Sequence, residues 1–227
     1  MKLAEDSKLY VALLADMVRS RDLGTRRAAV QEAVLAQVAR LNREHADLLR
    51  VPLALSGGDE VQGLLRRPSG AVPLMEALDL TRPEGVTWRF GLGAGDVTTA
   101  FRPTTFQMDG GCFLAARRAL ERARREKRRA AASGFPEPGD RVLDGVLAGI
   151  AAIRERWTDR QRQAAVVRRR HDTLTAAATA LGVTPPTLSK MLKAARLRDL
   201  DELQGALAVL LDLFAAGGSA AGEEGRP

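Results

Sequence analysis

The stretch that most constrains the fold of this chain is residues 86–97, which read VTWRFGLGAGDV. Apolar side chains alternate there with positions that include three glycines, and a period of two predicts a strand. The apolar positions are Val86, Trp88, Phe90 and Leu92, and the glycines are Gly91, Gly93 and Gly95. Because glycine has no side chain, one face of this strand is bare, and we expect another part of the chain to pack very close to it.

The segments around this strand predict a mixture of strands and helices. Short apolar runs predict strands at 9–15, 51–56 and 61–65, and apolar steps of three and four predict helices at 24–48, 70–79 and 111–130. The order β-α-β-β-α-β-α resembles the split β-α-β plan, an antiparallel sheet with helices on one face. We therefore expect an α+β, ferredoxin-like domain over residues 1–132.

A change in composition after this part divides the chain. Residues 133–139, SGFPEPG, contain two prolines and two glycines without periodicity, which indicates a linker. The pattern after it is helical, so residues 140–215 predict an all-α domain. Residues 216–227 have the composition of a disordered tail.

Composition favours a soluble, cytoplasmic protein. The single cysteine, Cys112, excludes a disulfide framework and a cysteine-based zinc site. No segment approaches the roughly 20 apolar residues of a membrane span, so we expect no membrane partner. The net charge is +7, and the run 117–129 holds eight basic and two acidic residues. Such a run favours contact with a polyanion, although a solvated helix face is the simpler alternative.

Residues 174–193, LTAAATALGVTPPTLSKMLK, meet the demands of a helix-turn-helix. Ala178 is small where two helices would cross, and Gly182 supplies a left-handed turn four residues later. Thr184 would cap the second helix, with Pro185 at its first position. The alternative is a plain helical hairpin used for packing. Residues 157–197 also resemble the region-four type of sigma-factor domains.

The second helix of this unit would present a polar and basic face suited to the major groove. The residues expected to contact double-stranded DNA are Thr187, Ser189, Lys190, Lys193 and Arg196. Regulators of this layout usually dimerise, so we expect a homodimer, for which the apolar stripes of 140–156 and 199–214 offer surface.

Three acidic residues are placed to meet at one edge of the predicted sheet. Asp16 ends the first strand, and Asp59 and Glu60 lie in the turn of LSGGDEVQGLL, residues 55–65. Converging carboxylates, completed by phosphate oxygens, are the ligands that Mg²⁺ prefers. Gly57 and Gly58 of the turn, with the three strand glycines, are the candidate cofactor-binding positions. The simpler alternative is that Gly57, Gly58 and Asp59 only form a hairpin turn.

Four motifs together resemble the SatD-like family and, more widely, the class III nucleotidyl cyclases. They are Asp16-Met-Val-Arg-Ser20, the run from Gly58 to Leu65, the run from Arg89 to Gly95, and Asp109-Gly110 with Ala116-Arg117. The turn is also similar to the GGDEF motif of diguanylate cyclases. The resemblance spans about 9–130 and the C-terminal helix-turn-helix. It implies a cyclase-like palm domain fused to a DNA-binding domain, with Mg²⁺ and a purine nucleotide as the ligands of the palm.

The same resemblance bears on catalysis. In active class III cyclases the last helix offers an Asn and, four residues on, an Arg to the transition state. Arg117 matches the Arg and is the candidate catalytic residue, but Phe113 stands at the Asn position. Losing one such donor costs roughly two to three orders of magnitude in rate. We therefore expect a DNA-binding regulator whose palm senses a nucleotide or mediates dimerisation. The alternatives are a Mg²⁺-dependent nucleotidyl cyclase and an interaction protein with an empty palm.

Overall fold

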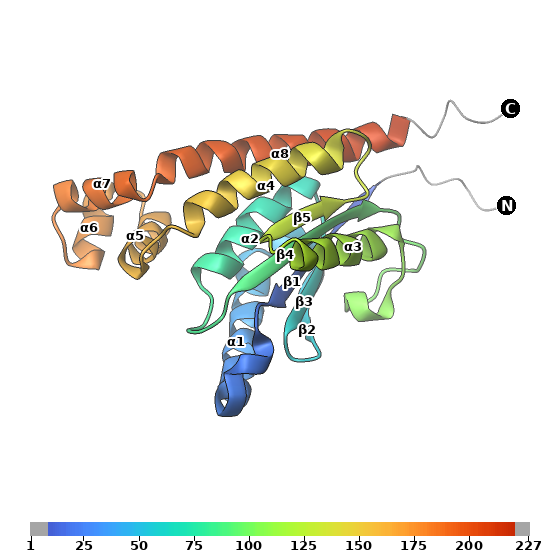
Figure 1. The fold of residues 1–227 in the computed structure, drawn as a ribbon, viewed down its shortest axis with the longest axis horizontal. Coiled ribbons are helices and arrows are strands. Elements are labelled where there is room, and N and C mark those ends of the chain that lie inside the picture. The colour runs from blue at the N-terminus through green and yellow to red at the C-terminus, as the bar shows by residue number, and fades with distance from the viewer. Residues whose placement is uncertain (1–8, 221–227) are drawn as a thin grey trace, which may run out of the picture.

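The computed structural model describes residues 9–220, with side chains described as far as residue 217, and shows a five-stranded sheet followed by five helices (Figure 1). The mixture confirms the α+β class. The strands are β1 (Tyr10–Met17), β2 (Leu49–Ser56), β3 (Glu60–Leu65), β4 (Trp88–Gly95) and β5 (Ala130–Ser133). The helices are α1 (Arg27–Glu44), α2 (Ala71–Leu80), α3 (Gly111–Arg125), α4 (Gly139–Arg154), α5 (Asp159–Arg170), α6 (Leu174–Leu181), α7 (Pro185–Ala194) and α8 (Leu197–Ala220).

The strand order in the sheet is β2-β3-β1-β4-β5. The first four strands pair antiparallel, and β3 lies between β1 and β2, as in a split β-α-β unit. β5 adds to the far edge, parallel to β4. The sequence-based helix at 111–130 is wrong at its end, because α3 stops at Arg125 and Ala130 already belongs to β5.

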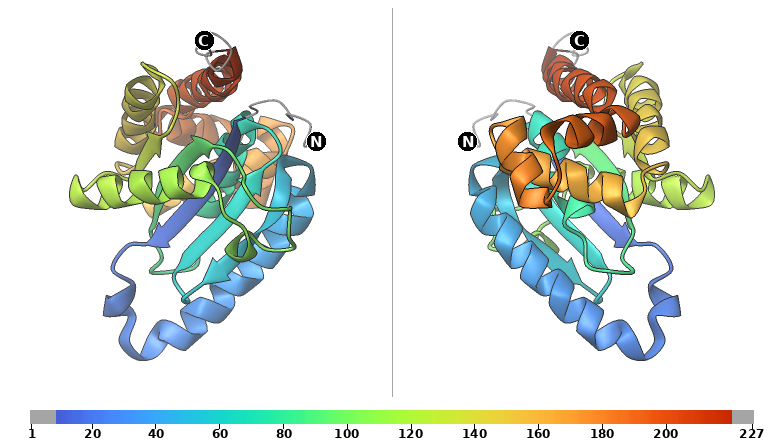
Figure 2. Two further views of the ribbon diagram at one scale, coloured as in Figure 1. Left: turned by 90° about the vertical axis from the view of Figure 1, so that its right-hand side faces the viewer. Right: turned by 90° about the vertical axis from the view of Figure 1, so that its left-hand side faces the viewer.

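The two faces of the sheet are covered by different helices. The side chains of β1 point alternately to the two faces. Val11 and Leu13 belong to the apolar cluster with α1 and α2, whereas Ala12 and Leu14 belong to the cluster with α3. Figure 2 shows α1 and α3 on opposite sides of the sheet. The expectation of helices on one face is therefore wrong. The apolar face of β4 packs in the cluster with α1 and α2, so α3, which connects β4 to β5, covers the glycine face.

The bare face of β4 packs directly on the backbone of α3, as predicted from the glycines. A Cβ added at Gly93 would lie 2.0 Å from the backbone nitrogen of Ala116, and one at Gly91 would lie 2.4 Å from the Ala116 carbonyl oxygen. Real Cβ atoms do not approach other atoms this closely. The glycines therefore set how near α3 lies to the sheet, and they fix its position along β4.

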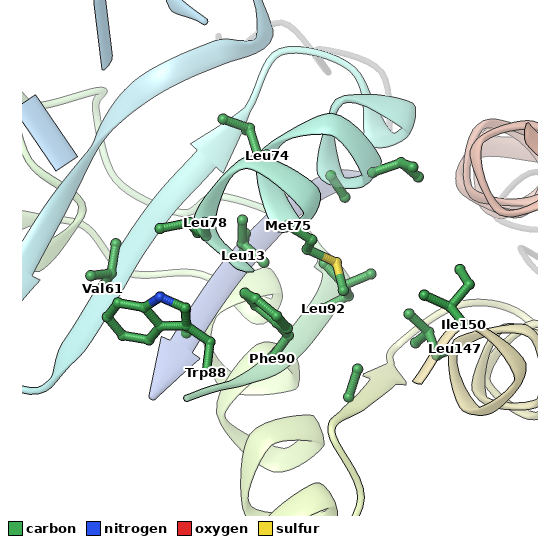
Figure 3. Close-up of a cluster of buried hydrophobic side chains, with 14 of the residues drawn as sticks. Leu13, Val61, Leu74, Met75, Leu78, Trp88, Phe90, Leu92, Leu147 and Ile150 are labelled. Atoms are coloured by element: carbon green, nitrogen blue, oxygen red, sulfur yellow. The ribbon is translucent and has the colours of Figure 1, made fainter. Parts of the chain in front are cut away.

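The helical part and the sheet share one hydrophobic core. Leu147 and Ile150 of α4 belong to the same buried cluster as Phe90 of β4 (Figure 3). Residues 133–139, expected to be a linker, contain the end of β5 and the first residue of α4. The proposed boundary between two domains stays a prediction, but apolar side chains pack across it.

Helices α4 and α8 pack against each other, so much of the apolar surface expected to serve a dimer lies inside the protomer. Val209 and Leu213 of α8 stay exposed, at 67% and 60%. α8 continues through Ala220, beyond residue 215, and the rest of the expected tail lies outside the described residues. None of the described helices combines the length and the apolar character that crossing a bilayer requires.

Candidate functional site

The predicted acidic residues meet at one end of the sheet. Glu60, Asp16 and Arg89 are register partners on β3, β1 and β4, so their side chains form a row on the face that α3 covers. Asp59 lies beside this row, in the turn before β3. Its backbone carbonyl accepts the Met17 N–H at 2.9 Å. The convergence expected from the hairpin and the strand end is therefore present.

Two arginines from α3 form ion pairs with the two acids of this row. Arg124 Nη2 donates to Asp16 Oδ2 at 2.8 Å, and Arg117 donates to both carboxylate oxygens of Glu60. Arg117 and Arg124 are seven residues apart, or two helical turns, so they project from the same side of α3. The hydrogen bond from Arg124 to Asp16, with the charges of the three nearby acids, raises the pKa of Arg124. Arg124 was not predicted, although its spacing from Arg117 was a usable signal.

Arg89 completes the surroundings of Asp16. Its Nη1 lies 3.8 Å from Asp16 Oδ2, and its Nε donates to the Arg128 carbonyl at 3.1 Å. Burial lowers the pKa of Arg89, against the opposing effect of the Asp16 charge. Asp16 is therefore a buried carboxylate that two guanidinium groups balance.

Ser20 links two of the sequence motifs. Its hydroxyl donates to Asp59 Oδ2 at 2.7 Å, so the Asp-x-Val-x-Ser segment and the Gly-Asp-Glu turn are joined by a side-chain hydrogen bond. Gly57 and Gly58 have φ of 59° and 86°, which is the left-handed region that glycine favours in a hairpin turn. The conformation of the turn is thus sufficient reason for both glycines.

As arranged, these acids do not fit a metal site. Among the described residues, no group of three or more His, Cys, Asp or Glu side chains is placed to hold an ion. Asp16 and Glu60 already accept from arginine, whereas Mg²⁺ requires several free oxygen ligands in octahedral geometry. We therefore derive no metal-dependent step from this arrangement, and a Mg²⁺–nucleotide complex at this edge stays a prediction.

Other predicted positions lie apart from the acids. Gly91, Gly93 and Gly95 face the α3 backbone, which fills the space a cofactor would need. The Asp109-Gly110 pair precedes α3 at the opposite end of β4, where the Gly111 N–H donates to Asp96 Oδ1 at 2.7 Å. Asp109-Gly110 and Gly95 thus lie at the opposite end of β4 from the acids, whereas Arg117, which belongs to the same motif as Asp109-Gly110, pairs with Glu60.

Several arginines of the run 117–129 form ion pairs within the chain, although most of its basic side chains are exposed. Besides the pairs described above, Arg122 and Arg128 lie 2.9 Å and 3.6 Å from Asp144 Oδ2, and Arg129 lies 3.3 Å from Asp79. Asp144 also accepts the Ala132 N–H of β5 at 2.8 Å. The basic run therefore fastens α3 and β5 to their neighbours.

Helices α5, α6 and α7 form a small unit with its own apolar centre. The fully buried members are Ala164, Ala177, Ala178 and Leu188, and half-buried side chains such as Val183 and Met191 surround them. Gly182 has φ 70° and ψ 34°, and the Val183 N–H donates to the Ala178 carbonyl at 3.0 Å. These features place two helices around a left-handed glycine, as the sequence pattern predicts.

Helix α7 begins with a side-chain cap and exposes one face. The Thr184 hydroxyl oxygen accepts the Thr187 N–H at 3.4 Å, and Pro185 occupies the first helical position. The four predicted DNA-contacting residues on α7 are exposed; they are Thr187, Ser189, Lys190 and Lys193.

Arg196, the fifth of these residues, differs from the others. It lies between α7 and α8 with φ 53°, and its Nε donates to Asp199 Oδ2 at 2.6 Å.

Four of the five arginines of α5 divide into two sets. Arg162 and Arg169 point toward the sheet side, where Arg162 lies 3.8 Å from Asp79, and Arg169 pairs with Glu76 and Asp201. Burial lowers the pKa of Arg169, but its hydrogen bonds to Asp201 and Glu76 raise it further, and the net shift is upward. Arg160 and Arg170 are exposed. α5 therefore connects the three-helix unit to α2 and α8 by ion pairs.

Comparisons with known proteins identify the family. No curated protein matches the chain. Among solved structures, the crystal structure of the catalytic core of a rhodopsin-guanylyl cyclase with converted specificity, in complex with ATPαS, is similar at a TM-score of 0.36 and 16% identity. That match covers 53% of this chain and 76% of the other, and at this score it bears on neither fold nor activity. The model of the SatD family matches residues 10–199, most of the chain, and the chain therefore belongs to the SatD family.

Proposed function

We propose that this SatD-family protein is a DNA-binding regulator whose α7 enters the major groove. The observation that carries the proposal is the division of α7 into two faces. Leu188 is fully buried in the centre of the three-helix unit, while Ser189, Lys190 and Lys193 are exposed on the other side. A recognition helix needs this division, because it must be held by its own unit and still present polar side chains to the groove.

The position of each side chain suggests its part in binding. Thr187 and Ser189 lie in the first half of α7, the part of a recognition helix that lies nearest the base edges. Lys193 lies in the last turn, where contact with a phosphate is the expected role. Arg196 is paired with Asp199, so in this proposal its contribution requires that pair to open.

The sheet's part in this function remains as expected from the sequence: to sense a nucleotide or to pair two protomers. Pairing would place two copies of α7 on half-sites of a palindromic operator. The cyclase alternative requires Asp16 and Glu60 to leave their arginines before they bind an ion, and no observation favours it.

The test measures the affinity for DNA and its salt dependence. Fluorescence anisotropy with labelled genomic fragments would compare the full chain with Lys190→Ala/Lys193→Ala. If both lysines contact phosphates, the slope of log K against log salt falls in magnitude by about 1.8, since each lost phosphate contact contributes about 0.9. Circular dichroism would establish that the variant is folded.

A matched control removes two cations elsewhere. Arg118 and Arg125 are exposed and lie two turns apart on α3, so Arg118→Ala/Arg125→Ala lowers the net charge by the same amount. We expect this variant to keep the wild-type slope. Equal slopes in the wild type and the lysine variant would contradict the proposal, and so would equal losses in both double variants.

A further inference from the structure

A cavity of about 210 Å³ lies between the sheet and the helical part. Its walls come from α2, β4, the residues just before and at the start of β5, and helices α4 and α5. It is on the sheet face opposite α3, so it is separate from the row of Asp16 and Glu60 and from the exposed face of α7. None of the candidate metal, cofactor, catalytic or DNA-contacting residues predicted from the sequence lines it.

Four arginines line this cavity, around one buried carboxylate. Arg82 and Arg129 lie 3.0 Å and 3.3 Å from Asp79 Oδ1, while Arg154 and Arg162 lie 3.8 Å from Asp79 Oδ2. Asp79 is 3% exposed.

Three further acids lie near these arginines. Glu155 also lines the cavity, and Glu76 lies outside its lining and accepts from Arg154 at 3.2 Å. Asp159 also acts on Arg162, and Glu76 is shared with Arg169, so Asp79 is the one carboxylate in contact with all four guanidinium groups.

The arginines also have unused hydrogen-bond donors. Arg154 Nε, Arg162 Nε and Arg162 Nη1 are buried and have no hydrogen-bond partner within the described chain. Buried donors are costly to leave unpaired. Burial lowers the pKa of Arg162, and the charges of Arg82 and Arg129 lower it further, against the opposing effect of Asp79 and Asp159. An additional anion at this place would supply acceptors and relieve the repulsion.

The remaining wall of the cavity is apolar. Figure 3 shows Met75 of α2 and Phe90 of β4 on one side and Leu147 and Ile150 of α4 on the other. Ala130 and Ala151 complete this wall. A cavity with charged donors at one part and hydrocarbon at another suits a ligand with the same division.

We propose that this cavity binds a small ligand that carries one oxyanion group on a short, apolar body. The arginines would hold the oxyanion, because planar guanidinium groups match the geometry of carboxylate and phosphate. Met75, Phe90 and Leu147 would contact the body. The volume is below the roughly 300–1,000 Å³ of pockets for drug-sized molecules, so the body has the size of a single ring or a short chain.

The first experiment is a thermal-shift titration of the full chain with four probes: phenyl phosphate, benzoate, inorganic phosphate and the uncharged benzyl alcohol. We expect a saturable rise in Tm with phenyl phosphate, benzoate or both. Inorganic phosphate should bind at least tenfold more weakly than phenyl phosphate, and benzyl alcohol should give no shift. The comparison of phenyl phosphate with benzoate identifies the oxyanion. No shift with either aromatic anion would overturn the proposal.

Two variants then locate the binding. Arg162→Gln removes a cation that Asp79 does not hold by a hydrogen bond, and Ala151→Leu fills part of the cavity without changing charge. We expect each to raise the Kd for the bound probe at least tenfold. Arg198→Gln is the control, because the Arg198 side chain is 90% exposed on α8 and outside the cavity. Unchanged binding in both cavity variants would show that the anion binds elsewhere and would refute the site. The result does not depend on whether the chain binds DNA.

Discussion

Replacing Gly93 by alanine tests the contact between α3 and the sheet. The new Cβ would lie 2.0 Å from Ala116 N, 2.3 Å from Cys112 O and 2.6 Å from Ala116 Cα. All three atoms belong to the backbone, so no side chain can turn away to make room. Reaching an ordinary contact of 3.4 Å requires α3 to move by about 1.4 Å, which is 3.4 minus 2.0.

The energetic cost follows from the packing that this movement disturbs. Ala116, Ala119 and Leu120 are at most 2% exposed, so moving α3 opens gaps along the whole contact. Overpacking of a core costs about 1–3 kcal/mol and more where the backbone must shift, and we expect Gly93→Ala to lower the free energy of unfolding by at least about 3 kcal/mol. For a chain of this length, Tm should fall by at least about 6 °C.

The control is the same substitution at an open position. A Cβ at Gly205, on the exposed side of α8, meets nothing within 4 Å, so Gly205→Ala should raise the stability by up to about 1 kcal/mol. Urea denaturation followed by circular dichroism, with a thermal scan, measures both variants. A Gly93→Ala protein within about 0.5 kcal/mol of the wild type would refute the argument that backbone contact fixes α3.

Four further outcomes follow from single residues. Leu188→Ala leaves a cavity in the small core of the three-helix unit and should cost about 2–5 kcal/mol, measured by urea denaturation. Gly182→Ala should cost about 1 kcal/mol although no atom obstructs a Cβ there, because φ is 70°; Gly182→Asn should cost less. Thr158→Ala removes the capping box of α5 and should lower stability by about 1 kcal/mol. Cys112 is fully buried, and burial raises its pKa to about 12, so a disulfide reagent at pH 8 should label it only after unfolding.

Much of the sheet could be predicted because its strands have strong patterns. The alternation in β4, the apolar run of β1 and the glycine turn between β2 and β3 are local signals, and each produced the expected element. β5 could not be found in this way. Its sequence, AAAS, favours helix by intrinsic propensity, and only the pairing with β4 makes it a strand.

The candidate sites also differ in whether local sequence patterns predict them. The two helices around Gly182 and the exposed face of α7 depend on residues close in sequence, and both were predicted. The pairing of Asp16 with Arg124 was not predicted, because the two residues are 108 positions apart and meet only through the packing of α3; the seven-residue spacing from Arg117 was the one local signal for it. The arginine cavity has no sequence signature at all, since its four cations come from different elements.

The orientation of helix α8 determines where α7 lies, because the two helices are joined by a short connection. Helix α8 begins three residues after α7 ends. Toward its other end, Asp212 accepts a hydrogen bond from the Ser69 N–H at 2.8 Å, and Ser69 lies next to the start of α2. The span from Leu197 to Asp212 is about 22 Å at 1.5 Å per residue. A tilt of about 5° around Asp212 would move the first turn of α8 by roughly 2 Å, which is more than a hydrogen bond tolerates. A small shift of the turn at Ser69, just before α2, would therefore become a larger displacement at α7.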